Sequence, residues 1–177
     1  RRRHGGGGGG GGGKFGATGG TGRNRKLADL YRPPHELLYN GTLHDAKQRA
    51  LARQRWLLVN LQRVDEFACQ QLNRDTWKDK MVANVIETHF VFCQYDELAE
   101  EGARFARFYN VRAPCVAIID PRTGELVKQW DRFVPPSDMH SHLSLFISDH
   151  VLSSSGYDAA GGGRQPAAAA TTAAGAT

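Results

Sequence analysis

The stretch Trp56-Leu57-Leu58-Val59-Asn60-Leu61-Gln62 decides which fold this chain can adopt, because five of its first six residues are apolar. A strand with one face in water alternates apolar and polar residues, whereas a strand with helices packed on both faces is apolar almost throughout. The stretch therefore predicts a central strand, buried on both sides, in an α/β sheet.

Helical and extended segments alternate outward from this strand. Apolar residues at i, i+3 and i+4, together with capping residues such as Thr42 and Ser137, indicate the helices, and short apolar runs indicate the strands. The expected helices cover residues 43–54, 65–72, 79–88, 97–109 and 137–150, and the expected strands cover 56–62, 90–95, 115–119 and 126–131. The turn Asp120-Pro121-Arg122-Thr123-Gly124 predicts an antiparallel hairpin of the last two strands. The order predicts an α/β fold with two parallel crossovers, then this hairpin and a packing helix.

Composition divides the 177-residue chain into a core and two ends. Residues 1–24 hold 13 of the 21 Gly and five basic side chains without an acid, which accounts for the whole net charge of +5. Glycine loses the most backbone entropy on ordering, so we expect residues 1–24 and the Ala/Thr/Gly-rich residues 153–177 to be disordered linkers. Residues 25–152 have the length of one domain. Because the chain starts with Arg1 between such linkers, we interpret it as a piece of a longer, multidomain protein.

The same sequence disfavours several classes of function. Its apolar stretches fall far short of the roughly 20 residues that span a bilayer. The cluster Arg1–Arg3 beside the Gly tract lacks interleaved aromatic residues, and we expect no nucleic-acid partner. Three cysteines, an odd number, argue against a secreted disulfide scaffold and favour the nucleus or the cytoplasm. No cofactor or metal site is predicted, since His140 and His142 lie two apart on a helix and face different sides.

Two motifs flank the predicted central strand as they do in thioredoxins. Glu66-Phe67-Ala68-Cys69 follows the strand at the start of a helix, and Ala113-Pro114 precedes the apolar strand expected across from it. Three stretches of the chain resemble the UAS domain of UBX-domain proteins. They are Phe67-Ala68-Cys69-Gln70-Gln71-Leu72-Asn73-Arg74-Asp75-Thr76-Trp77, the turn 120–124 and Leu30-Tyr31-Arg32-Pro33-Pro34. The chain is most similar to the branch that has an N-terminal ubiquitin-associated domain and a C-terminal UBX domain. The resemblance covers about residues 27–150.

This resemblance implies a thioredoxin-like fold, with a central mixed sheet of about four to five strands flanked by helices. It also implies a non-catalytic interaction module in an adaptor that links ubiquitylated clients to the valosin-containing-protein type of AAA+ ATPase. The implied partners are proteins of the ubiquitin pathway, and the implied process is ubiquitin-dependent protein catabolism. Contact with the ATPase is then expected through domains outside this chain.

The redox motif of a thioredoxin is incomplete here. Disulfide exchange needs a thiolate at the helix start, where the helix dipole lowers the Cys pKa, and a second Cys three residues on. Glu66 stands in the first position and Cys69 in the second. A carboxylate cannot attack a disulfide, so we expect no dithiol exchange, and Glu66 is predicted to raise the pKa of Cys69 by like-charge repulsion. A thiol-redox enzyme that works through Cys69 alone is one alternative function. The resemblance further implies a cis peptide bond before Pro114.

Other residues are interpreted mainly as core. Cys93 and Cys115 fall in predicted strands and are expected to be buried thiols, and Trp77 is expected to point inward.

An apolar face is predicted on the helix 97–109, formed by Leu98, Phe105, Phe108 and Tyr109. The three aromatic residues of this face would pack into the core or line a groove for a lipid chain, because some related UAS domains resemble fatty-acid sensors. A module that oligomerises in response to a long-chain fatty acid is therefore the second alternative function.

Overall fold

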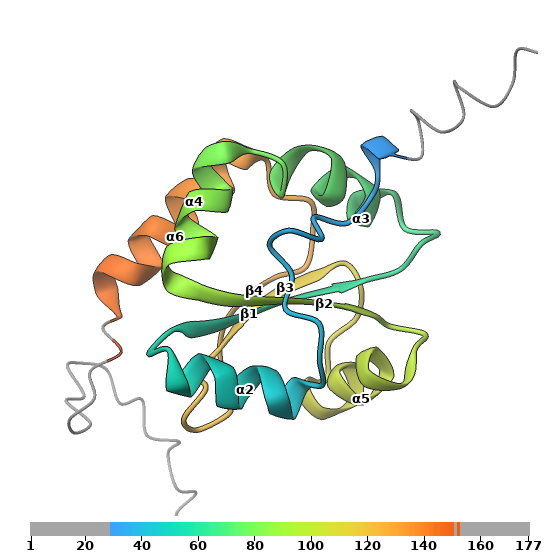
Figure 1. Ribbon diagram of the computed structural model, residues 1–177. Helices are drawn as coiled ribbons and strands as arrows, with labels where there is room; N and C mark the ends of the chain where they lie inside the picture. The colour runs from blue at the N-terminus through green and yellow to red at the C-terminus, as the bar shows by residue number, and fades with distance from the viewer. Residues whose placement is uncertain (1–28, 151, 153–177) are drawn as a thin grey trace, which may run out of the picture.

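The computed structural model describes residues 29–150 and 152, so both predicted linkers, 1–24 and 153–177, lie outside the described residues. One sheet has the strand order β2-β1-β3-β4, with helices on both faces (Figure 1). The strands are β1 (Trp56–Gln62), β2 (Phe90–Asp96), β3 (Cys115–Ile119) and β4 (Leu126–Trp130). The helices are α2 (Leu43–Ala52), α3 (Phe67–Gln71), α4 (Lys80–His89), α5 (Glu100–Tyr109) and α6 (Pro136–Asp149), and a π-helical turn, η1 (Leu72–Thr76), follows α3.

Strand β1 is the buried central strand that the sequence predicts. Its first six residues are buried, and successive side chains enter opposite layers of the core. Trp56 and Leu58 pack in the layer that includes side chains of α4 and α6, whereas Leu57 and Val59 pack in the layer that includes side chains of α2 and α5. Figure 1 shows these two pairs of helices on opposite faces of the sheet. The continuous apolar run therefore reflects two cores that meet at one strand.

The prediction of two parallel crossovers is wrong for the second one. β1 and β2 are parallel, but β3 is antiparallel to β1, with Leu61 opposite Cys115. The backbone N–H of Ala113, which follows α5, donates to the carboxylate of Glu97, which precedes α5, at 3.2 Å. The chain therefore returns to the edge where β2 ended, and β3 must run in the opposite direction. The predicted hairpin of β3 and β4 is confirmed, with Gly124 in the left-handed region at φ 76°.

Four of the five predicted helix starts differ from the structure: α3 begins two residues later than predicted and α4 one residue later, and α5 and α6 also shift. α5 begins at Glu100 rather than at residue 97, because the Asp96 side chain accepts the N–H of Leu98 at 2.9 Å and holds that residue in a loop. α6 begins at Pro136, and Ser137, the predicted cap, lies in its first turn. Proline suits the first helical position, where its missing N–H leaves no bond unmade. None of the described helices is long and apolar enough to cross a membrane.

The predicted apolar face of the fifth helix is correct only in part. Phe105 is buried, and Tyr109 is half-buried with its hydroxyl donating to the carbonyl of Gly124 at 2.8 Å. Leu98 and Phe108, however, are 77% and 76% exposed. Leu98 lies outside the helix, and Phe108 lies on the side of α5 that faces solvent. Trp77 points inward as predicted, with 1% of its surface exposed and its ring 4.9 Å from that of Phe92.

Candidate functional site

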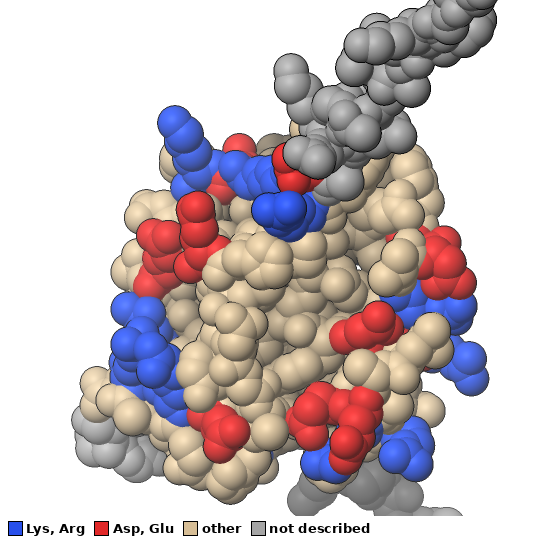
Figure 2. Space-filling model, turned by 45° about the vertical axis from the view of Figure 1, so that its right-hand side comes forward, with Lys and Arg blue, Asp and Glu red and all other residues tan. Residues whose placement is uncertain are grey.

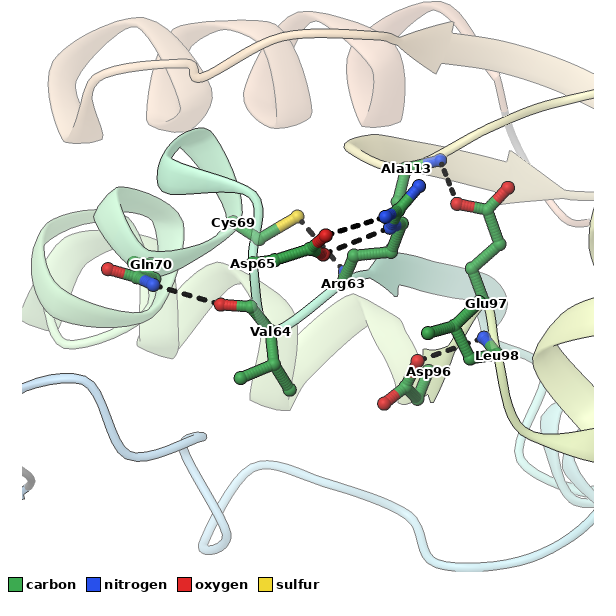
Figure 3. Close-up of polar contacts among 9 residues, drawn as sticks. All are labelled: Arg63, Val64, Asp65, Cys69, Gln70, Asp96, Glu97, Leu98 and Ala113. Atoms are coloured by element: carbon green, nitrogen blue, oxygen red, sulfur yellow. Dashed lines mark hydrogen bonds and ion pairs between the residues drawn. The ribbon is translucent and has the colours of Figure 1, made fainter.

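The parallel strands β1 and β2 end at the same edge of the sheet, and β3 begins there. We call the surface formed by residues 63–69, 96–98 and 113–114 the carboxyl edge. Figure 3 shows residues of all three segments near one another, with the Arg63 side chain between Asp65 and the bonded pair Glu97 and Ala113. Its parts are joined by the register of Leu61 opposite Cys115 and by the hydrogen bond between Glu97 and Ala113. All the redox-motif positions singled out in the sequence fall on this edge.

Glu66 acts as the N-cap of α3. Its side chain accepts the N–H of Ala68 at 3.5 Å, a role that fits a carboxylate at the positive end of a helix. The same helix start would hold the attacking thiolate of a redox enzyme. Glu66 therefore occupies that position with a group that stabilises the helix and has no redox chemistry.

Cys69 lies one turn into α3 and is 1% exposed. Its Sγ accepts a hydrogen bond from the backbone N–H of Arg63 at 3.4 Å (Figure 3). Burial is the largest cause that raises the pKa of the Cys69 thiol, the bond from Arg63 opposes it, and the charge of Glu66 adds to it. The predicted direction of the shift is correct, but desolvation outweighs the predicted repulsion. A thiol that is buried and resists ionisation is poorly suited to attack a substrate.

Pro114 lies at the start of β3, and the peptide bond between Ala113 and Pro114 is cis. In the redox enzymes that the sequence resembles, this proline shapes a substrate groove beside the thiolate. Here the Glu97 carboxylate accepts the N–H of Ala113, so that donor is already used within the chain (Figure 3). The carboxyl edge thus combines a cis proline with a buried thiol, Cys69, and a backbone donor that is already bonded within the chain.

Sequence reasoning missed the ion pair that orders the loop after β1. The Arg63 guanidinium donates from Nε to Asp65 Oδ1 at 3.0 Å and from Nη2 to Asp65 Oδ2 at 2.6 Å. The hydrogen bond from Arg63 is the largest cause that lowers the pKa of the Asp65 carboxyl. A usable signal was present, because charged residues follow both parallel strands, whose carboxyl ends share an edge: Arg63, Asp65 and Glu66 after β1, and Glu97 after β2.

Three large apolar side chains lie exposed among these charges. Val64 is 76% exposed, Phe67 is 58% exposed and Leu98 is 77% exposed. Val64 and Phe67 flank the ion pair and the helix cap, and Leu98 comes from the loop after β2. Apolar residues gathered on one surface and rimmed by polar groups are typical of protein-interaction sites.

Within residues 29–150 and 152, the remaining cysteines and histidines form no cluster that could hold a metal ion. Cys93 and Cys115 are buried free thiols, as predicted, and burial raises their pKa to about 11 and about 12. Among the described residues, no group of three or more His, Cys, Asp or Glu side chains is placed to hold a metal ion. His142 stacks on Trp130 with ring centroids 5.5 Å apart, so its role is packing rather than ligation.

As one alternative, the sequence predicts that the aromatic residues of α5 would line a groove for a lipid chain. A hollow of about 440 Å³ does run beside α5, but Leu98, Ala106 and Val111 line it instead of the aromatic residues. Phe105 is a core residue, in line with the packing interpretation. The fatty-acid alternative therefore has no groove of the expected kind at this helix.

Comparison with known proteins points to one family. Residues 38–121 match the family described as Thioredoxin-like. The chain is 45% identical over 134 residues to UBX domain-containing protein 2 of Schizosaccharomyces pombe. The aligned residues cover 75% of this chain and 31% of that protein. The chain is 39% identical over 135 residues to UBX domain-containing protein 5 of Saccharomyces cerevisiae, and this alignment covers 73% of this chain and 27% of that protein. The chain thus spans less than a third of the length of these relatives.

Solved structures agree on the fold. A thioredoxin from Thermus thermophilus superposes with a TM-score of 0.55 at 25% identity, over 61% of this chain and 85% of that protein. A putative disulphide-isomerase from Bacteroides thetaiotaomicron superposes with the same TM-score of 0.55 at 23% identity, over 64% of this chain and 93% of that protein.

Proposed function

Because the chain belongs to the thioredoxin-like family and is a relative of the UBX domain-containing proteins, we propose that its core is a non-catalytic interaction module of a ubiquitin-dependent adaptor. The adaptor would serve the valosin-containing-protein type of AAA+ ATPase, which would be contacted by other parts of the full protein. The compartment that we propose is the nucleus or the cytoplasm.

The proposal rests on the residues that form the carboxyl edge. Where a redox relative needs an exposed thiolate, this chain has a helix-capping carboxylate, Glu66, and a buried thiol, Cys69. Around them lie the exposed apolar side chains of Val64, Phe67 and Leu98. An exposed apolar surface without a nucleophile supports binding rather than catalysis.

The net charge of the carboxyl edge indicates which kind of partner it would bind. The carboxyl edge holds four acids and one basic residue, so its net charge is −4 + 1 = −3; the acids are Asp65, Glu66, Asp96 and Glu97, and the base is Arg63. Figure 2, in which the side of the molecule at these strand ends comes forward, shows acidic side chains separated by uncharged surface. A surface of a ubiquitin-pathway protein with apolar residues between lysines and arginines would complement this edge in both shape and charge.

Nuclear magnetic resonance of the ¹⁵N-labelled chain, with ubiquitin as the probe, tests the proposal. We expect ubiquitin to shift the backbone signals of residues 63–67 and 96–98, and the double substitution Phe67→Ser with Leu98→Ser to weaken binding by about tenfold or more. Leu145→Ser is the matched control, because Leu145 is 62% exposed and lies on α6. Shifts at other surfaces only, or equal losses in the control, would contradict an interaction through this edge.

A thiol assay separates this function from the single-Cys enzyme. The chain is expected to catalyse no thiol–disulfide exchange above the level of free thiol, and Cys69→Ser and Cys93→Ser are expected to behave alike. An exchange activity that Cys69→Ser abolishes and Cys93→Ser spares would replace the interaction module with a redox enzyme.

A further inference from the structure

A hollow of about 330 Å³ lies at the end of the sheet opposite to the carboxyl edge. Three arginines line it, Arg49, Arg53 and Arg55, and its apolar part includes Ile86, Phe90 and Phe92. We call it the arginine hollow. Nothing in the function proposed above uses it.

The chain brings the three arginines together by the way α2 ends. Arg49 lies in the last turn of α2 and Arg53 is its C-cap, so the two are four residues apart on one side of the helix end. Gln54 then adopts the left-handed conformation, with φ 52°. The N–H of Arg55 donates back to the carbonyl of Ala50 at 2.9 Å, which returns Arg55 to the same end of the helix.

These three arginines differ from most others in the described part of the chain. Five arginines there have a carboxylate oxygen within 3.0 Å: Arg32, Arg63, Arg74, Arg104 and Arg122. No described carboxylate lies within 4.0 Å of the guanidinium nitrogens of Arg49, Arg53 or Arg55. In Figure 2 basic side chains gather at the left of the molecule, beside the end of α2.

An aromatic ring supports one of these groups. The guanidinium carbon of Arg49 lies 5.1 Å from the centre of the Tyr39 ring, and Tyr39 also lines the hollow. Stacking of this kind uses the face of the guanidinium and leaves its N–H groups, which lie in the plane, able to donate. Arginine forks bind carboxylates and phosphates through paired, charge-assisted hydrogen bonds.

We propose that the arginine hollow is a docking site for a phosphorylated side chain of a partner polypeptide, with an apolar residue beside it, because a phosphate offers three acceptor oxygens to the three arginines. The arginines bind the phosphate, and the apolar neighbour packs against Leu37 and Leu38, which line the hollow and are partly exposed. Glu36 and Glu87 also line the hollow and repel a run of negative charges. They restrict the ligand to one oxyanion rather than an acidic tract.

Three peptides that differ at one position test the proposal, with phosphoserine, Glu or Ser at that position between two Leu residues. We expect the first two to shift the side-chain Nε–Hε signals of Arg49, Arg53 and Arg55 in the ¹⁵N-labelled chain, and the Ser peptide to leave them in place. The phosphoserine peptide should bind more tightly than the Glu peptide, since a phosphate carries more charge and one more acceptor oxygen than a carboxylate. Arg53→Gln should weaken binding by about tenfold.

The control is Arg107→Gln, since Arg107 is an exposed arginine on α5. It should leave binding unchanged, and both variants should keep the unfolding temperature of the wild type. Five results would overturn the proposal: equal or tighter binding of the Glu peptide, equal shifts with the Ser peptide, equal weakening by Arg107→Gln, no shift at about 1 mM peptide, or concentration-dependent shifts of these arginines without any peptide. The last result would assign the hollow to contact with a second copy of this chain.

Discussion

The carboxylate of Glu97 and the backbone of Ala113 are joined by a hydrogen bond of 3.2 Å that spans 16 positions of sequence. This bond ties the loop after β2 to the residue before Pro114. It places the start of β3 at the carboxyl edge, and it occupies the donor that a segment docking beside the proline would otherwise meet. One side chain thereby affects both the direction of a strand and the shape of the candidate site.

Replacing Glu97 should show how much this bond contributes. Glu97→Ala leaves the N–H of Ala113 without its acceptor, and we expect the free energy of unfolding to fall by about 1–2 kcal/mol. Glu97→Gln keeps an oxygen in place and should lose less than half of that. Urea unfolding of the two variants measures the difference, and equal losses would show that charge rather than the hydrogen bond matters.

Gly102 permits the close contact of α5 with the end of β2. A Cβ at this position would lie 1.8 Å from the carbonyl oxygen of Asp96, a backbone atom that cannot move aside cheaply. Although Ala normally favours a helix over Gly by about 1 kcal/mol, Gly102→Ala should destabilise the chain by about 3 kcal/mol or more. Gly41→Ala is the control, because its nearest atom, at 2.8 Å, belongs to the Tyr39 side chain. Thermal unfolding in which the two variants lose the same stability would contradict the contact.

Stability should fall in alkali because of the buried thiols. Burial raises the pKa of Cys93 from 9.0 to about 11 and that of Cys115 from 9.0 to about 12. Well below pH 9 both thiols are neutral in either state. As the pH rises through 9 the unfolded chain ionises first, so stability is lost as the pH rises toward these values. Each thiol should lower the free energy of unfolding by about 1 kcal/mol at pH 10 relative to pH 8. Urea unfolding at both pH values measures the change, and Cys115→Ala should show a smaller decrease than the wild type.

The volume of the Trp77 side chain, and not its N–H, should contribute to the free energy of unfolding. The ring is 1% exposed, and its Nε1 has no hydrogen-bond acceptor among the described residues. Trp77→Phe, which keeps an aromatic ring against Phe92, should cost less than about 2 kcal/mol, and Trp77→Ala about 3–5 kcal/mol. Denaturant unfolding of the pair measures both losses. A loss in Trp77→Phe as large as that in Trp77→Ala would contradict the prediction.

The sequence alone determined the features that depend on neighbouring residues. The apolar run 56–62 predicted the central strand, because burial on both faces requires apolar side chains at successive positions. The turn with Gly124 predicted the hairpin, because its backbone conformation favours glycine. The loss of dithiol chemistry stays a prediction, which rests on Glu66 standing where a thioredoxin has a cysteine, since a carboxylate cannot act as a thiolate.

Only the tertiary structure decided the features that depend on residues far apart in the chain. The antiparallel direction of β3 follows from the contact between Glu97 and Ala113, and the predominance of burial in the raised pKa of Cys69 follows from the packing around it. The arginine hollow forms because the end of α2 meets the start of β2, two segments that no local pattern connects. Local propensity selects helices and strands, but long-range packing selects which of their side chains share a surface.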